Sequence, residues 1–234
     1  MMQPCSHWMR ALLGGVLLSL AAQAQASFAL YEGRLGRYPI SLVMEYHNAV
    51  QRGLYFYERH RTPILLKPFI HHSGPLATDE LDSSGLPSAR LSFYASGFYK
   101  STASLQGRWT DYRTGKSLPL QLTLTGYLDN DGVWPQGKPL SLPQAASTDR
   151  HLFRIPMSHS ASVVTEIDVH DKATGARLQV LKTPSPQCNH GMHSVDLRYV
   201  QGKTQLVLPT STHCPGTVFE LNPASGLFEV PSQP

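Results

Sequence analysis

The side chains best suited to chemistry gather in one stretch near the C-terminal end of the chain. From residue 184 to residue 215 it reads PSPQCNHGMHSVDLRYVQGKTQLVLPTSTHCP. Thiolate, imidazole and thioether groups are ligands for zinc and copper. The spacing Cys-x-His-x-x-His matches no established zinc finger, so a polar surface loop is the competing interpretation. The side chains concerned are Cys188, His190, Met192, His193, His213 and Cys214.

The first 26 residues have the pattern of a secretory signal peptide. Arg10 precedes an apolar run from Ala11 to Ala22, and Ala24-Gln25-Ala26 supplies small residues at the positions a signal peptidase reads. The run is short for a permanent membrane anchor, and Cys5 lies before it, where lipid attachment at the cleavage site cannot use it. We therefore expect cleavage after Ala26 and a periplasmic protein without a membrane anchor.

Export determines what the two remaining cysteines are expected to do. After the leader is removed only Cys188 and Cys214 are left, in a compartment that oxidises thiols. The disulfide predicted between them would close a loop worth roughly 3 to 4 kcal/mol of stability in the chain-entropy treatment. It would consume both sulfurs and weaken the metal interpretation.

The sequence carries no recognisable catalytic signature. Gly-x-Ser-x-Gly is absent, and no cysteine is left free after pairing. Glu166 and Asp168 share one face of a predicted strand, and Glu80 and Asp82 have the same spacing in a predicted loop. Glycosidase chemistry needs one carboxyl in an apolar pocket, and neither pair is set in apolar sequence. We expect no catalytic residues, no bound metal, no cofactor and no enzymatic activity.

The charge pattern argues against nucleic acid as a partner. The net charge is +4, and loss of Arg10 with the leader lowers it to +3. Acidic and basic residues are interspersed, without the basic run or the Arg and aromatic alternation typical of a nucleic-acid track. The mild positive balance is compatible with an acidic partner.

Alternation with a period of two, punctuated by Gly, Pro, Asn and Asp, predicts an all-β protein. Leucines at 118, 120, 122 and 124 alternate with other residues in the clearest strand, and residues 40, 42, 44 and 46 form one face of another. Ser41, Glu45 and His47 lie on the opposite face of that strand. Successive hairpins predict an antiparallel meander, either barrel-like or propeller-like.

The chain divides at a proline-rich segment. Residues 135–150 contain three prolines and a glycine near their start, without an apolar period, and are predicted to be a linker. The expected organisation is a leader over 1–26, an N-terminal β half over 27–134 and a C-terminal β half over 151–234. Five aromatic residues either close the β core or form an interaction surface: Tyr55, Tyr57, Tyr94, Phe98 and Tyr99.

An ordered set of β-hairpin signatures supports one family resemblance. The C-terminal half contains VVTEIDVHD at 163–171, TG at 174–175, QVL at 179–181, DL at 196–197, FELNP at 219–223 and GLF at 226–228. The runs GRLGRYPI at 33–40 and GLYFY at 53–57 add to it. Together they resemble an exported, propeller-like bacterial family that includes periplasmic immunity proteins, which inhibit peptidoglycan-hydrolysing, lysozyme-like effectors. The resemblance implies a binding protein.

The chain departs from that family at the place where its members often bind calcium. Members often carry an Asp-rich calcium loop, and the matching place here is Asp196 to Gly202. Calcium requires six to eight oxygen ligands, whereas Arg198 brings a cation and Val200 brings no ligand. The calcium site is therefore not expected.

The combined expectation is a periplasmic protein that inhibits a peptidoglycan hydrolase and acts as an immunity protein. Pro186 stiffens the loop that the disulfide anchors, and His190 and His193 are expected to donate hydrogen bonds to the partner's acidic cleft. The alternative is a periplasmic protein that binds a metal or small ligand through the His/Met-rich loop 188–193.

Overall fold

The computed structural model describes residues 27–47, 49–69, 75–95, 98–99, 102–129, 132–157 and 163–231. The predicted leader, residues 1–26, lies outside them. The described chain is nearly all β, with antiparallel strands in three sheets and one 3-10 turn, η1 (Gly191–His193). No helix in these ranges is long and apolar enough to cross a membrane.

The N-terminal half is a closed eight-stranded barrel. Each strand pairs with the next along the chain, and β1 also pairs with β8, so the sheet has no free edge between them. The short strand β9 (Gly132–Trp134) continues from β8. The barrel strands are β1 (Ser27–Leu35), β2 (Tyr38–His47), β3 (Ala49–Tyr57), β4 (Ile64–Pro68), β5 (Ala77–Leu81), β6 (Pro87–Phe93), β7 (Ser104–Asp111) and β8 (Ser117–Asp129).

The barrel interior is filled by the side chains that alternation predicted to share one face. Leu42 and Met44 of β2 pack inside with Leu120 and Leu122 of β8, all nearly inaccessible to solvent. An eight-stranded barrel is just wide enough for its own side chains to fill. Gly33 lies at the β1–β8 seam, where a Cβ atom would come within 2.0 Å of the Gln121 carbonyl oxygen.

The C-terminal half forms two four-stranded antiparallel sheets. Its first strand covers residues 140–147, half of the segment 135–150 that was expected to be a linker, so that prediction differs from the structure. Residues 140–157 form one hairpin, in which Leu140 pairs with Met157. The second sheet contains β10 (Leu140–Ser147), β11 (His151–Met157), β12 (Val163–Asp171) and β13 (Arg177–Cys188), and the third contains β14 (Asp196–Val200), β15 (Lys203–Leu208), β16 (Thr217–Asn222) and β17 (Leu227–Glu229).

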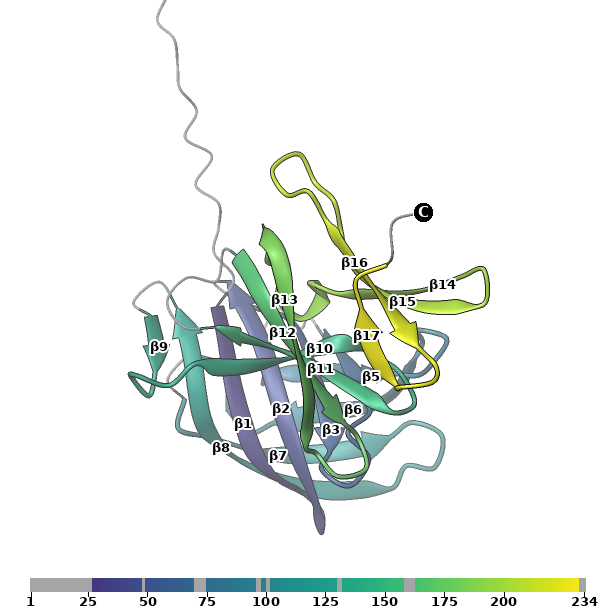
Figure 1. Ribbon diagram of the computed structural model, residues 1–234. Helices are drawn as coiled ribbons and strands as arrows, with labels where there is room; N and C mark the ends of the chain where they lie inside the picture. Colours follow the sequence, from purple (N-terminus) through teal and green to yellow (C-terminus); the bar gives the residue numbers. More distant parts are fainter. Residues whose placement is uncertain are drawn as a thin grey trace, which may run out of the picture.

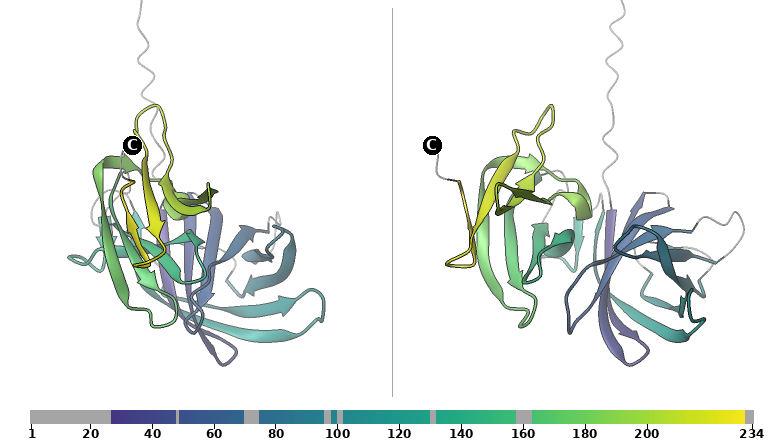
Figure 2. Two further views of the ribbon diagram at one scale, coloured as in Figure 1. Left: turned by 45° about the vertical axis from the view of Figure 1, so that its right-hand side comes forward. Right: turned by 90° about the vertical axis from the view of Figure 1, so that its right-hand side faces the viewer.

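The two halves form adjacent lobes that share a core (Figures 1 and 2). Outward-facing apolar side chains of the first three barrel strands, among them Phe28, Val43 and Phe56, join a cluster with Phe153 of β11 and Phe219 of β16. Strands β1 to β3 are therefore apolar on both faces. The all-β prediction is confirmed, and its barrel-like alternative describes the N-terminal half.

Candidate functional site

The predicted disulfide is present. The sulfurs of Cys188 and Cys214 are bonded, with their Cα atoms 5.6 Å apart. Cys188 ends β13, and Cys214 lies in the loop between β15 and β16, so the bond ties the second sheet to the third. The loop is also closed by main-chain hydrogen bonds in both directions between Ser211 and Cys214.

The disulfide joins two exposed segments, residues 184–190 and 209–215, which we call the disulfide-linked surface. Pro184, Pro186 and His190 are exposed in the first segment, and His213 and Pro215 are exposed in the second. Neither segment contains Asp, Glu, Lys or Arg. The surface therefore offers hydroxyl, amide and imidazole groups on a backbone restricted by prolines and a covalent bond.

The part of the loop that follows His190 turns into the protein. Met192 is buried, and its neighbour Gly191 has no room for a side chain because a Cβ atom would meet Phe28 and Glu45. The Asn189 amide oxygen accepts hydrogen bonds from the Gly191 N–H at 2.9 Å and from the Ser194 hydroxyl at 2.7 Å. The turn η1 is therefore a packed element, while Pro184, Pro186 and His190 before it remain exposed.

The three residues expected to bind a partner do not lie together. Pro186 and His190 are exposed on the disulfide-linked surface, whereas His193 is half-buried in η1. Burial and the nearby Arg52 guanidinium lower the pKa of His193, although Glu45 and Asp196 act in the opposite direction. His193 therefore lies on the side of the loop that faces the barrel.

An ion pair on the barrel holds the other side of this loop, and alternation alone did not reveal it. Glu45 and Arg52 are cross-strand partners on β2 and β3. Two Arg52 nitrogens donate to the Glu45 carboxylate at 2.7 and 2.8 Å, and Arg52 also donates to the His190 carbonyl at 3.2 Å. Glu45, predicted on the strand face opposite Leu42 and Met44, is buried because η1 covers it. The ion pair thus positions the backbone of His190.

The metal interpretation of the loop loses its strongest ligands in this arrangement. Both sulfurs are bonded to each other and cannot act as thiolates. The Met192 side chain is inside the core, with 1% of its surface exposed. The ranges described contain no group of three or more His, Cys, Asp or Glu side chains placed to hold an ion.

Lys172 provides a second polar link between the lobes. Although it is buried, its ammonium group donates to the hydroxyls of Thr62 at 3.2 Å and Ser147 at 3.0 Å. Its carbonyl accepts a 2.8 Å hydrogen bond from Arg61. Burial lowers the pKa of Lys172. These contacts fix the turn 171–175 against the barrel.

A carboxylate cluster inside the barrel was also missed by sequence reasoning. Glu80, assigned to a loop from composition, belongs to β5 and points inward. Its Oε2 accepts hydrogen bonds from the Tyr55 hydroxyl at 2.6 Å and the Trp109 indole N–H at 2.8 Å. Burial and Glu80 raise the pKa of Tyr55. Tyr55 is thus buried in the barrel core and Tyr57 packs against it, as one of the two interpretations held, whereas Tyr94 and Tyr99 are exposed.

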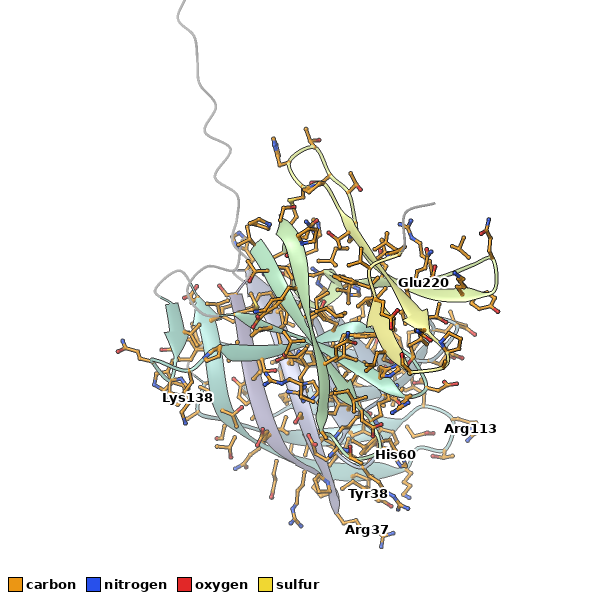
Figure 3. All side chains as sticks on the ribbon, viewed as in Figure 1. Arg37, Tyr38, His60, Arg113, Lys138 and Glu220 are labelled. Atoms are coloured by element: carbon orange, nitrogen blue, oxygen red, sulfur yellow. A yellow bond between two sulfur atoms is a disulfide. The ribbon has the colours of Figure 1, made fainter. Side chains whose placement is uncertain are left out.

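An open groove of about 350 Å³ lies at the end of the third sheet. The Lys203 ammonium donates to Glu220, and the Asn222 amide donates to Glu229 at 3.2 Å across its floor. Figure 3 shows Glu220 on β16, on the lobe opposite the barrel. Each charged group that lines this groove therefore already has a partner within it.

Comparisons of the chain with protein-family models, with curated proteins and with solved structures found no match.

Proposed function

We propose that this protein is a periplasmic binding protein that inhibits a peptidoglycan hydrolase and so acts as an immunity protein. The observation that supports the proposal is the disulfide-linked surface. Because a disulfide, prolines and the Arg52 contact to His190 already restrict its backbone, little conformational entropy is lost when it docks. A preorganised loop of this kind suits insertion into an enzyme cleft.

The chemistry of the surface fits an acidic cleft. Hydrolases that cleave glycosidic bonds generally use a pair of carboxyl groups. The exposed His190 and His213 side chains can donate hydrogen bonds to carboxylates, and the two segments contain no acidic residue that would repel them. The proposed complex therefore places imidazole groups against catalytic carboxylates.

The test combines a binding assay with an enzyme assay. The purified protein is mixed with peptidoglycan hydrolases encoded beside its own gene, and both complex formation and the rate of cell-wall lysis are measured. We expect a complex that slows lysis. We expect His190→Ala to weaken inhibition at least about tenfold, which corresponds to about 1.4 kcal/mol.

The matched control is His60→Ala. His60 is also an exposed histidine, but it lies on the turn between β3 and β4, near Tyr38 at one end of the barrel (Figure 3). Inhibition should be unchanged in this variant. The absence of both a complex and inhibition, or equal losses in the two variants, would refute the proposed role of the surface.

A further inference from the structure

Strand β14 is an open edge of the third sheet. In the described structure it pairs only with β15, and four of its five residues are exposed. The β14–β15 hairpin projects from the C-terminal lobe in Figure 1. Tyr199 near its tip has 76% of its surface exposed. Edge strands of this kind are templates for pairing with another chain.

The turn of the hairpin determines which backbone groups of β14 are free. Gln201 and Gly202 both have positive φ angles, and Val200 pairs with Lys203 across this two-residue turn. In such a hairpin the residues that flank the turn exchange hydrogen bonds, and every second residue then does the same. The N–H and C=O groups of Leu197 and Tyr199 consequently point away from β15, towards the open edge.

Two unpaired charges of opposite sign lie beside these groups. Asp196 and Arg198 are two residues apart, so their side chains project from the same face of the strand. Both are exposed, and neither has a hydrogen bond or ion pair within the part of the chain that the structure describes. Between them lies Leu197, which packs against the shared core from the other face.

We propose that β14 pairs with β14 of a second copy of this chain, in an antiparallel arrangement centred on Leu197. A two-fold axis at Leu197 brings Asp196 of each copy opposite Arg198 of the other, and this forms two identical ion pairs. The outward N–H and C=O groups of Leu197 meet those of the second copy. Tyr199 lies diagonally beside the second copy's Leu197, which covers part of the exposed ring.

The charges select this register over its neighbours. Centring the pair on Arg198 would place two guanidinium groups directly opposite each other, which is unfavourable. Centring it on Tyr199 would leave Asp196 beyond the paired residues, without a basic partner. Only the Leu197 register satisfies both charges. The contact is short, and interfaces this small are weak and transient.

Sedimentation equilibrium of the purified protein tests the proposal over concentrations from about 1 µM to about 500 µM. We expect reversible dimerisation with a Kd of roughly 10–100 µM, in the range of transient contacts. Arg198→Glu and Asp196→Lys should each raise the Kd at least about tenfold, because each places two pairs of like charges together. The double variant, D196K with R198E, should return the Kd to within about threefold of the wild type, since the pairs form again with their signs exchanged.

Arg108→Glu is the matched control, since Arg108 is an exposed arginine on barrel strand β7 without an ion pair to any residue that the structure describes. It should leave the Kd unchanged. A protein that stays monomeric at the highest concentration would overturn the proposal, as would a dimer that tolerates both single reversals or is not restored by the double variant. Circular dichroism in the near ultraviolet confirms that each variant is folded. Loss of hydrolase inhibition bears on the function proposed above and not on this contact, because the variants leave residues 184–190 and 209–215 intact.

Discussion

Replacing both Cys188 and Cys214 with alanine is expected to destabilise the protein by about 3.5 kcal/mol. The disulfide closes a loop with a sequence separation of 26 residues. The chain-entropy treatment assigns a loop of that size about 12 cal/mol/K, which is about 3.5 kcal/mol at 25 °C. For a chain of this length each kcal/mol lowers the Tm by about 2–4 °C, so the expected decrease is about 7–14 °C.

Urea denaturation at 25 °C, followed by circular dichroism, gives the free energy of unfolding of both proteins. The wild-type protein under reducing conditions should match the double variant, because both lack the same covalent link. Ser211→Ala is the matched control, since its hydroxyl lies 3.4 Å from the Cys188 sulfur and its removal leaves the bond intact. A loss below about 1 kcal/mol in the double variant would refute the assignment of loop entropy to this bond.

Two further predictions concern the packing of η1 against the barrel and the histidines of the second sheet. Gly191→Ala should lower the free energy of unfolding, measured by urea denaturation, by at least about 2 kcal/mol more than Gly85→Ala does. Both glycines have positive φ angles, but only at position 191 would a Cβ atom meet other atoms, at 2.7 and 3.0 Å. Stability should also fall as the pH falls below about 6.5, because the pKa values of the buried His151 and the half-buried His170 are lowered, mainly by desolvation, and the unfolded chain then binds protons that the folded chain does not.

Each prediction has an outcome that contradicts it. An equal decrease in the free energy of unfolding of the two glycine variants would mean that η1 can move away from the barrel without loss of stability. For the pH dependence, urea midpoints are compared at pH 7.5 and pH 5.0 in the wild type and in His170→Gln. If the urea midpoint of the variant changes between the two pH values as much as that of the wild type, the His170 imidazole does not bind protons differently in the folded and unfolded states.

The elements that the sequence predicted well are those with a single dominant pattern. The leucines at 118, 120, 122 and 124 alternate because one face of β8 fills the barrel, and that strand lies where alternation placed it. The disulfide followed from the number of cysteines that lie outside the predicted leader. Barrel closure was not predictable, because it depends on the pairing of β1 with β8, about ninety residues apart in sequence, which leaves no local signal.

The errors came from residues whose environment is set by parts of the chain that are distant in sequence or by strand pairing. Alternation places Glu45 on the strand face opposite Leu42 and Met44 and gives no sign of its burial, yet η1 and Arg52 enclose it. Leu140 and Leu142 lie in a proline-rich segment without a regular apolar period. Their strand is recognisable only from its pairing with β11. His193 was grouped with His190 by composition, although a three-residue turn directs the two imidazoles differently. Local sequence does not encode contacts between the halves.

The double-sided burial of β1 to β3 has a consequence for how this chain matures. The barrel strands precede the C-terminal half in the sequence, so the barrel can close before the residues from 140 onward have been synthesised. Until the C-terminal half packs against the barrel, the outer faces of β1 to β3, which carry Phe28, Val43 and Phe56, are exposed to water. A fragment that ends near residue 134 would leave this apolar surface permanently exposed, and we expect it to aggregate. The C-terminal half therefore covers apolar surface of the barrel, and the two lobes share one core although each has its own sheets.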